Sequence, residues 1–303
     1  MSELAPPQMA VRAGREALAR AGLPGTSLDL MVHAWIHHQG HDFWSPAHYI
    51  ADELGAGGAL PFGIQQMCNG GSVALQTAAA HLLADSGLRH ALTTTADRFA
   101  EPGFARWNGD YGVVYGDAAT AVLLHRTPRS DDVLHLLSVA TVAAPELEQV
   151  HRGDDFFSDA PRRHGEAVDV RRTKKAFLAE HGTERLASVT TASVRRVVRQ
   201  ALDEAGVDRD DPGLRHLLLP RLGRAALDGA YLPALGGLPH CRIHDFGADT
   251  GHLGAGDTPA NLADLVASGL IGPGETAVAV SGGGGFSWSA AVVRAPGRRG
   301  PSS

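Results

Sequence analysis

The hydrophobic and polar positions of this chain follow two periods, one of about 3.6 residues and one of about two. The longer period predicts amphipathic helices over 8–22 and 193–206, and each is followed by an apolar run that predicts a buried strand, over 28–36 and 214–219. The matching phrases are REALARAG before LDLMVHA and RQALDEAG before LRHLLLP. A helix–strand unit therefore occurs twice in the chain.

The rest of the pattern predicts strands that alternate with helices. Strands are expected over 61–66, 90–96, 116–125, 133–142, 241–246, 275–281 and 286–294, and helices over 46–54, 70–86 and 257–269. GDAATAVLLHR at 116–126 resembles GFSWSAAVVRA at 285–295, which indicates an internal duplication. We therefore expect an α/β fold with central sheets covered by helices.

The duplication predicts a first half over 1–144, which includes the strand at 133–142, and a second half over 186–295. Residues 145–185 between them are charged and weakly periodic, which fits either a solvated connector or a lid over the substrate. Residues 296–303, PGRRGPSS, are expected to form a disordered tail.

Composition and charge narrow the class of protein. The chain has 303 residues, of which 44% are hydrophobic and 20% charged, so it can bury a large core. Its formal net charge of -6 gives no cationic surface for nucleic acid. No run of about 18 apolar residues occurs, and MSELAPPQMAVRAGRE lacks the pattern of a signal peptide. A cytoplasmic protein without a membrane span is expected.

The chain has two cysteines, Cys68 and Cys241, and neither lies in a CxxC or a Cys/His cluster. No disulfide framework or structural zinc site is therefore predicted. The histidines of MVHAWIHHQGHDFW (31–44) fit no compact helical ligand pair, so they are expected to be loop residues without a metal.

Cys68 is the candidate nucleophile. It lies in PFGIQQMCNGGSVALQTAAAHLL (61–83), where a short strand leads into a glycine pair and then an Ala/Leu-rich helix. A sulfur at a helix N-terminus is stabilised as the thiolate, which is the reactive form. A buried thiol that only packs beneath a helix is the alternative, but the order strand, Cys, Gly-Gly, helix favours a reactive one.

Four segments together resemble the ketoacyl-ACP synthase III branch of the thiolase superfamily. They are the Cys68 segment, YGDAATAVLL (115–124), GHLGAGDTPANLADLVASGLIGPGE (251–275) and SGGGGFSWSAAVV (281–293). The resemblance covers the chain from about residue 8 to about residue 295. It implies a duplicated, five-layered αβαβα thiolase fold that forms a homodimer, and a ping-pong enzyme in which Cys68 carries the acyl group as a thioester.

GHLGAGD differs from the matching GNTSA segment of the condensing members, which carries a catalytic Asn. It resembles the acyltransferase subgroup of bacterial antibiotic and other natural-product pathways, which move an acyl chain to a hydroxyl or an amine. By position His252 replaces the Asn, and it is our candidate for the base that takes the acceptor's proton. Asp257 is expected to orient His252, to hold the acceptor, or to cap the following helix.

The family's catalytic His lies in a PHQAN-like phrase, where this chain has LLLPRLGRAAL (217–227). Pro220 matches the Pro, and Arg221 takes the place of the His. An arginine cannot act as a base near neutral pH, so acyl transfer is favoured over decarboxylative condensation. Two alternatives stay open, a ketoacyl synthase whose base is His240 or His244, and a non-catalytic partner subunit of a ketosynthase heterodimer.

The resemblance also implies an oxyanion hole formed by the amides of Cys68 and Gly284. The chain begins at the helix that follows the family's first strand and its Trp/Arg segment for coenzyme A, so that strand segment is expected to be missing. An acyl carrier protein is therefore the favoured donor and acyl-CoA the alternative. The phosphopantetheine thioester is a substrate, and no cofactor is expected. Arg221 and Arg224 are candidates for contacts with the substrate or the carrier.

Overall fold

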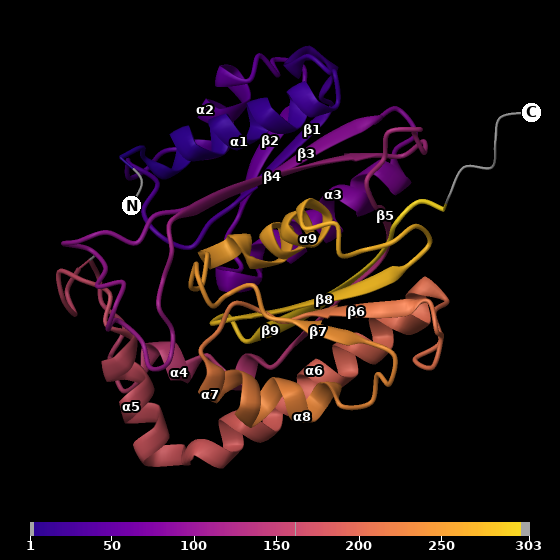
Figure 1. The fold of residues 1–303 in the computed structure, drawn as a ribbon. Helices are drawn as coiled ribbons and strands as arrows, with labels where there is room; N and C mark the ends of the chain where they lie inside the picture. The colour runs from indigo at the N-terminus through magenta and orange to yellow at the C-terminus, as the bar shows by residue number, and fades with distance from the viewer. Residues whose placement is uncertain (1–2, 161, 298–303) are drawn as a thin grey trace, which may run out of the picture.

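The computed structural model describes residues 3–160 and 162–297. Two β-sheets lie one above the other, with helices between them and on both outer faces (Figure 1). None of the helices within the described ranges is long and apolar enough to cross a membrane. The described part of the 296–303 segment is Pro296 and Gly297, and the rest of the predicted tail lies outside the described residues.

The first sheet has four strands in the order β2-β1-β3-β4, with β1 parallel to β2 and β3, and β4 antiparallel to β3. The strands are β1 (Leu30–Ala34), β2 (Leu60–Ile64), β3 (His90–Asp97) and β4 (Ala118–His125). Helices α1 (Pro6–Arg20) and α2 (Pro46–Glu53) cover its outer face (Figure 1). Apolar residues at helical spacing on α1, among them Ala10, Val11 and Leu18, form the buried side of that contact.

The second sheet has five strands in the order β5-β9-β8-β6-β7. The strands are β5 (His135–Ala143), β6 (Leu214–Leu218), β7 (Arg242–His244), β8 (Thr276–Gly283) and β9 (Ser287–Arg294). Helix α6 (Thr183–Ala205) covers its outer face, followed around the rim by α7 (Arg224–Ala226), a π-helical turn (Leu227–Tyr231) and α8 (Leu232–Leu235). Val194, Val197 and Ala201 on one side of α6 pack against this sheet.

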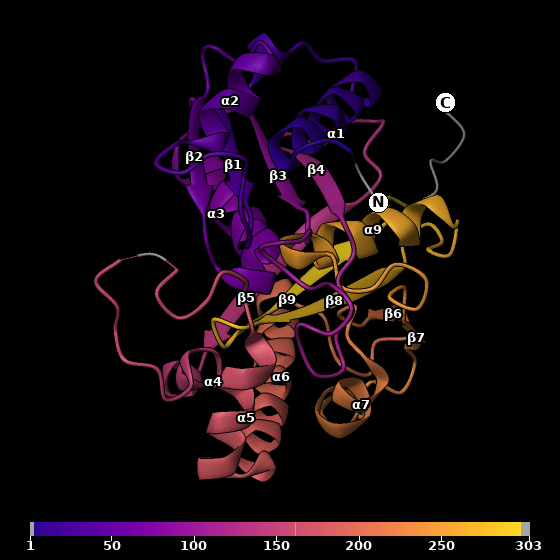
Figure 2. The same cartoon turned by 90° about the vertical axis from the view of Figure 1, so that its left-hand side faces the viewer.

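Helices α3 (Gly70–Ala84) and α9 (Asp257–Ala267) lie between the two sheets (Figure 2). The layers therefore run helix, sheet, helix, sheet, helix, as the five-layered prediction requires. The strand orders β2-β1-β3-β4 and β7-β6-β8-β9 correspond, with parallel and antiparallel pairs in the same places. The duplication inferred from 116–126 and 285–295 is thus confirmed, since these segments lead into β4 and β9.

The strand predicted at 133–142 joins the second sheet. It was assigned to the first half of the chain, and in the structure it is β5, which pairs with β9 and forms an edge of the second sheet. Its residues Ala140 and Val142 are buried in the core that α6 covers. The hydrophobic pattern along a strand shows which of its faces is buried, but it does not show which strand lies beside it. In the chain β5 stands before the connector, so its position gave no sign that it belongs with the second sheet.

The connector at 145–185 is more ordered than its weak periodicity suggests. It contains a 3-10 turn (Pro145–Leu147), α4 (Gln149–Arg152) and α5 (Val170–His181), and α6 already begins at Thr183. Val150 of α4 and Phe177 of α5 are buried in the same hydrophobic core as the residues of α6 that pack against the second sheet. The Asp169 carboxylate accepts a hydrogen bond from the Arg172 amide, 3.0 Å away, and so caps α5. This segment is therefore anchored on the body of the protein.

Candidate active site

Cys68 lies in a sharp turn between β2 and α3. The strand ends at Ile64, a 3-10 turn (Met67–Asn69) carries the cysteine, and α3 begins at Gly70. Met67 has a φ of 49°, a left-handed conformation that costs an ordinary residue about 1 kcal/mol. The turn thus places a half-buried thiol at the N-terminal end of a 15-residue helix, whose first amides have no partners within the helix.

Asn69 fixes this turn to the opposite sheet. Its buried side-chain amide donates to the hydroxyls of Ser287 and Ser289, at 3.1 and 2.9 Å, and its carbonyl oxygen accepts from Ser281. The Ser72 hydroxyl, one turn into α3, bonds to both Thr258 and Ser281 at 2.8 Å. Because these groups come from both halves of the duplication, the position of the nucleophile is set by the contact between the halves.

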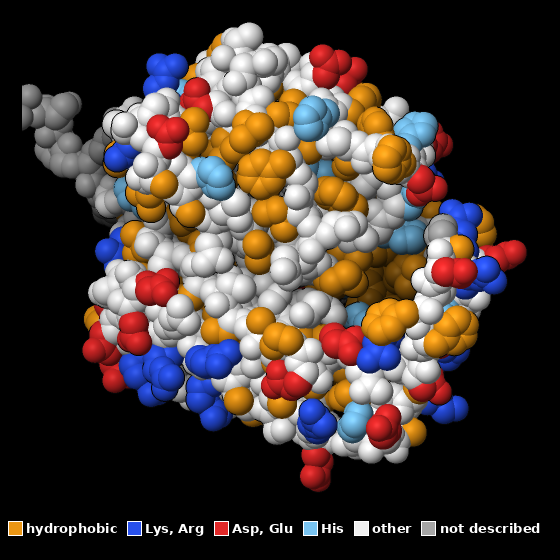
Figure 3. Space-filling view, turned by 180° about the vertical axis from the view of Figure 1, so that it is seen from behind, with side chains coloured by type: hydrophobic (Ala, Val, Ile, Leu, Met, Phe, Trp, Pro, Cys, Tyr) orange, Lys and Arg blue, Asp and Glu red, His pale blue; other side chains and the backbone are white. Residues whose placement is uncertain are grey.

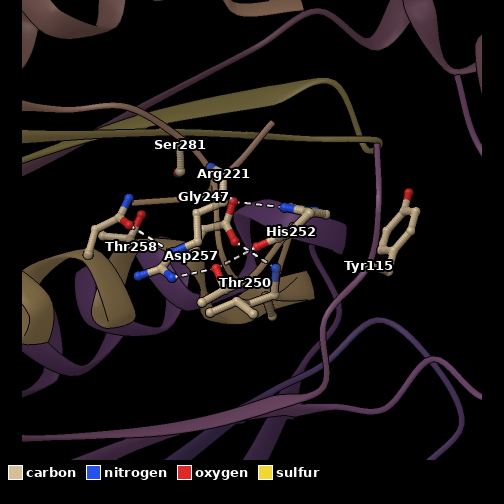
Figure 4. A network of polar contacts seen from close by, with 12 residues as sticks. Tyr115, Arg221, Gly247, Thr250, His252, Asp257, Thr258 and Ser281 are labelled. Atoms are coloured by element: carbon tan, nitrogen blue, oxygen red, sulfur yellow. Dashed lines mark hydrogen bonds and ion pairs between the residues drawn. The ribbon is translucent and has the colours of Figure 1, made fainter. Parts of the chain in front are cut away.

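His252 and Asp257 form a buried pair (Figure 4). The His252 Nδ1 atom lies 2.7 Å from the Asp257 Oδ2 atom, and both residues are 1% exposed. Asp257 Oδ2 also accepts from the Arg221 amide at 2.9 Å, and its Oδ1 accepts from the Leu253 amide at 2.8 Å. All described contacts of the carboxylate are with the His252 imidazole and with backbone amides that precede Asp257 in the chain. Asp257 is therefore the partner of His252 and not a cap of α9.

The first half of the chain holds His252 in place. Its amide donates to the Val114 carbonyl and its carbonyl accepts from the Gly116 amide, both at 2.8 Å. The Tyr115 ring meets the imidazole edge-on, with ring centroids 5.4 Å apart. His252 Nε2 is buried and has no nitrogen or oxygen partner among the residues that the structure describes, while the Cys68 sulfur is its neighbour. Since Nδ1 is engaged by Asp257, Nε2 is the atom left to exchange a proton.

The charges of the site support each other. Burial alone lowers the pKa of His252, but the Asp257 carboxylate and the neighbouring Cys68 sulfur outweigh it and hold that pKa well above its usual value. Burial raises the pKa of Asp257, and the His252 charge and two backbone hydrogen bonds bring it below its usual value. The arrangement therefore favours an imidazolium that faces the sulfur and is balanced by a carboxylate behind it.

The glycine turn after β8 closes the other side of Cys68. A Cβ atom on Gly283 would lie 2.8 Å from the Cys68 amide nitrogen and 2.6 Å from that of Asn69, so only glycine fits there. In the described residues neither the Cys68 nor the Gly284 amide donates a hydrogen bond to a protein group. An oxyanion hole requires two free N–H groups beside the nucleophile, so the assignment of these two amides to it stays a prediction.

Arg221 does not point to the substrate side, in contrast to its expected contact. The residue is 2% exposed, and its guanidinium bonds to Asn261 at 2.9 Å, to Thr250 at 2.8 Å and to Asp264. A buried cation must be paired, and α9 supplies the partners here. Arg224 is exposed and pairs with Asp228 of the π-helical turn that follows α7, so its proposed contact with a carrier remains a prediction.

The alternative bases lie in other surroundings. His244 is buried and its Nε2 atom lies 3.0 Å from Nδ1 of His216, which in turn bonds to Glu275 at 2.9 Å. His240 lies in an exposed turn before β7. No described contact joins either histidine to Cys68, so His252 is the histidine that the fold brings to the sulfur.

Asp97 is a buried residue that the sequence reasoning missed. At the end of β3 it accepts from the amides of Ile36 and His37, at 2.8 and 2.9 Å, and from that of Ala255 at 3.0 Å. Burial raises its pKa to about 6, although these hydrogen bonds lower it. A carboxyl residue directly after the strand predicted at 90–96 was the signal available. Through Ala255, Asp97 supports the turn that leads from His252 to Asp257.

On the back of the molecule a deep hollow with mostly hydrophobic walls opens on the side where α4 and α5 lie (Figure 3). Two surface cavities, of about 260 and about 540 Å³, are lined by residues of 35–65 and of 105–175, and Cys68 lines neither. The second cavity is lined in part by Tyr111 and Arg171, and the Arg171 guanidinium stacks over the Tyr111 ring, 4.4 Å from its centroid.

Two duplicated halves that meet over one cysteine are the architecture of the thiolase fold, and comparison with known proteins gives the family. The family model for 3-oxoacyl-[acyl-carrier-protein] synthase III matches residues 62–142, and the model for its C-terminal domain matches residues 191–295. The chain belongs to the 3-oxoacyl-ACP synthase III family of thiolase-fold enzymes.

Several relatives are similar over nearly the whole chain. The structure of ChlB3, an acyltransferase, is 33% identical, with a TM-score of 0.86 over 98% of this chain and 86% of that one. The β-ketoacyl-ACP synthase III of Roseiflexus castenholzii is 28% identical over 94% of this chain and 82% of its own length. The synthase III structure from Aquifex aeolicus has a TM-score of 0.73 at 23% identity, covers 97% and 85% of the two chains, and confirms the fold.

Proposed function

We propose that this protein is an acyltransferase that takes an acyl group from a carrier-protein or CoA thioester onto Cys68 and passes it to a hydroxyl or amine acceptor. The observation that carries the proposal is the buried pair of His252 and Asp257, with Nδ1 and Oδ2 2.7 Å apart and the free Nε2 left to serve the sulfur. The amides of Cys68 and Gly284 would stabilise the oxyanion of each tetrahedral intermediate.

The charges suggest how one histidine serves both half-reactions. In the free enzyme the Cys68 thiolate attacks the donor carbonyl, the donor's C–S bond breaks, and the His252 imidazolium gives its proton to the departing thiolate, which leaves as the thiol. Cys68 then carries no charge, and its contribution to the raised pKa of His252 is lost. The neutral imidazole can therefore take the proton of the acceptor while the acceptor oxygen or nitrogen attacks the thioester and the thiolate leaves.

The contacts of Arg221 favour transfer over condensation. Condensing members of the family carry their catalytic imidazole at this position, whereas here the Arg221 side chain is committed to Thr250, Asn261 and Asp264. The similarity to ChlB3 points the same way, because that relative is an acyltransferase. On these grounds, and on the resemblance of GHLGAGD, we assign the reaction to natural-product biosynthesis.

A homodimer is part of the proposal. Within the described ranges β2 pairs only with β1, so its other edge is open, and Leu60 on this strand is 61% exposed. An open edge beside the nucleophile's turn could pair with the same strand of a second copy. Size-exclusion chromatography with light scattering tests it, and a monomer at micromolar concentration would contradict it.

The test of the function separates the two half-reactions. The protein is incubated with a panel of acyl-carrier and acyl-CoA thioesters, intact-mass spectrometry detects the adduct, and peptide mapping locates it. Candidate acceptors are then added and the decay of the adduct is followed. We expect an adduct on the peptide that contains Cys68, and its absence with every donor would overturn the proposal.

A further inference from the structure

His151 of α4 lies directly against the glycine turn of the site. A Cβ atom on Gly284 would meet its ring at 2.0 Å from Cε1 and 2.4 Å from Nδ1, so ring and backbone are in full contact. The ring also meets Phe286 edge-on, with centroids 5.4 Å apart. The Ala144 amide donates to the Phe286 carbonyl at 2.8 Å, which ties the start of the connector to the same turn. The position of His151 is therefore fixed.

The same turn contacts both His151 and the segment of the nucleophile. Gly283 contacts the Cys68 amide, and Gly284 contacts the His151 ring. An oxyanion held by the amides of Cys68 and Gly284 would lie beside this segment. The His151 ring and the position of the acyl group thus adjoin neighbouring residues of one turn.

The ring nitrogens of His151 are available for a hydrogen bond with a substrate. Among the described residues its half-buried ring has no hydrogen-bond partner. The neighbouring Asp110 is saturated, since it pairs with Lys174 at 3.1 Å and accepts from the Tyr111 amide at 2.6 Å and the Tyr115 hydroxyl at 3.4 Å. Burial lowers the pKa of His151, while the Asp110 charge raises it and the Lys174 charge lowers it further. A neutral imidazole has one N–H to donate.

We propose that His151 binds the acceptor, that the acceptor is a hydroxyl compound, and that the imidazole N–H donates a hydrogen bond to the attacking oxygen. The proposal rests on the acyl-transfer function above. A hydroxyl oxygen has two lone pairs, so one can accept from His151 while the other attacks the acyl carbon and the O–H points to His252. The C–O bond forms, the C–S bond breaks, the proton passes to His252 and Cys68 leaves as the thiolate.

The chemistry of the contact discriminates between acceptors. A neutral amine has a single lone pair, which must form the new bond, so it cannot accept from His151 while it attacks. An ammonium ion would need a free carboxylate, and Asp110 is already paired with Lys174. The position therefore favours an alcohol, or water as its smallest analogue.

The test compares His151→Phe with His151→Gln. Phenylalanine keeps a ring against Gly284 and loses the donor, whereas glutamine restores a donor. The acyl-enzyme is formed with whichever thioester loads the wild type, freed of donor, and mixed with buffer alone, with glycerol or with propylamine. Intact mass follows the loss of the adduct, and the products are analysed for free acid, ester and amide.

We expect His151→Phe to load at the wild-type rate, to lose hydrolysis and transfer to glycerol by about tenfold, and to keep its reaction with propylamine. His151→Gln should recover part of the lost rate. An equal loss with all three nucleophiles would mean that the ring only supports the oxyanion turn, and an unchanged rate with water and glycerol would mean that it does not bind the acceptor. Either result overturns the inference, whereas a wild type that never loads overturns the acyltransferase function itself.

Discussion

The Oδ2 atom of Asp257 accepts hydrogen bonds from two groups that the chain brings from different places, the His252 ring at 2.7 Å and the Arg221 amide at 2.9 Å. His252 is thereby held with Nδ1 toward the carboxylate, which leaves Nε2 for the sulfur and the substrate. The backbone of Arg221 thus contributes to the orientation of the base, although its side chain is turned away into the network with α9.

The first prediction concerns the two cysteines. Cys68→Ala should abolish acyl loading, because Cys68 alone lies at a helix N-terminus beside His252. Cys241→Ala is the matched control and should load normally, since burial raises the pKa of Cys241 to about 11 and keeps it a thiol. Intact mass after incubation with an acyl thioester measures both. An adduct on the Cys68→Ala protein would contradict the assignment of the nucleophile.

The second prediction concerns His252 and Asp257. His252→Ala should slow transfer to the acceptor by roughly 10²–10⁴-fold and trap the acyl-enzyme, because an alcohol must lose its proton as it attacks. Asp257→Asn should have a smaller effect in the same direction, since it changes the orientation of the imidazole but keeps the ring. Single-turnover loading and decay of the adduct, measured separately, give the two rates. Normal turnover by His252→Ala would place the base elsewhere.

Much of this fold could be predicted from the chain because each half repeats its own pattern. The helix–strand units and the glycine turns before β4 and β9 are local features, and period and turn residues are local signals. The place of β5 beside β9 is a contact between segments about 150 residues apart, and nothing in its alternation specifies that partner.

The site divides in the same way. Cys68 lies in a short phrase whose order of strand, glycine pair and helix indicates a reactive thiol, and the family resemblance of GHLGAGD pointed to His252 and Asp257. Asp97 and His151 reach the site through contacts with Ala255 and Gly284, which are far away in the chain. Such residues belong to no motif with a characteristic spacing, so the packing of the two halves is needed to reveal them.

The third prediction concerns Asp97, whose pKa burial raises from 3.8 to about 6. Since the folded state holds the proton more tightly than the unfolded chain, the stability from this group is fully present below pH 3.8 and is lost as the pH rises through about 6. The shift corresponds to roughly 3 kcal/mol. Asp97→Asn resembles the protonated carboxyl, so it should lack this loss.

Urea unfolding of both proteins from about pH 4 to about pH 7 tests this, because contributions from all other groups cancel in the difference. The Asp97→Asn protein should gain free energy of unfolding relative to the wild type as the pH rises. A difference that does not change with pH would show that Asp97 is not titrating in this range.

The last prediction is that the protein does not catalyse decarboxylative condensation of a malonyl thioester. That reaction develops an enolate, which the condensing members of the family stabilise with a His and an Asn, and this chain has Arg221 and His252 at those positions. The Arg221 guanidinium could serve an enolate only by leaving Asn261, Thr250 and Asp264, and a buried cation without partners costs about 3–5 kcal/mol. An acyl donor and a malonyl carrier are therefore supplied together, and carbon dioxide and β-ketoacyl product are assayed. We expect neither, while the acyl adduct on Cys68 persists. Formation of both, with loss of both in Cys68→Ala, would make the protein a synthase and refute the acyltransferase assignment, because condensation would then proceed with Arg221 and His252 at the two positions.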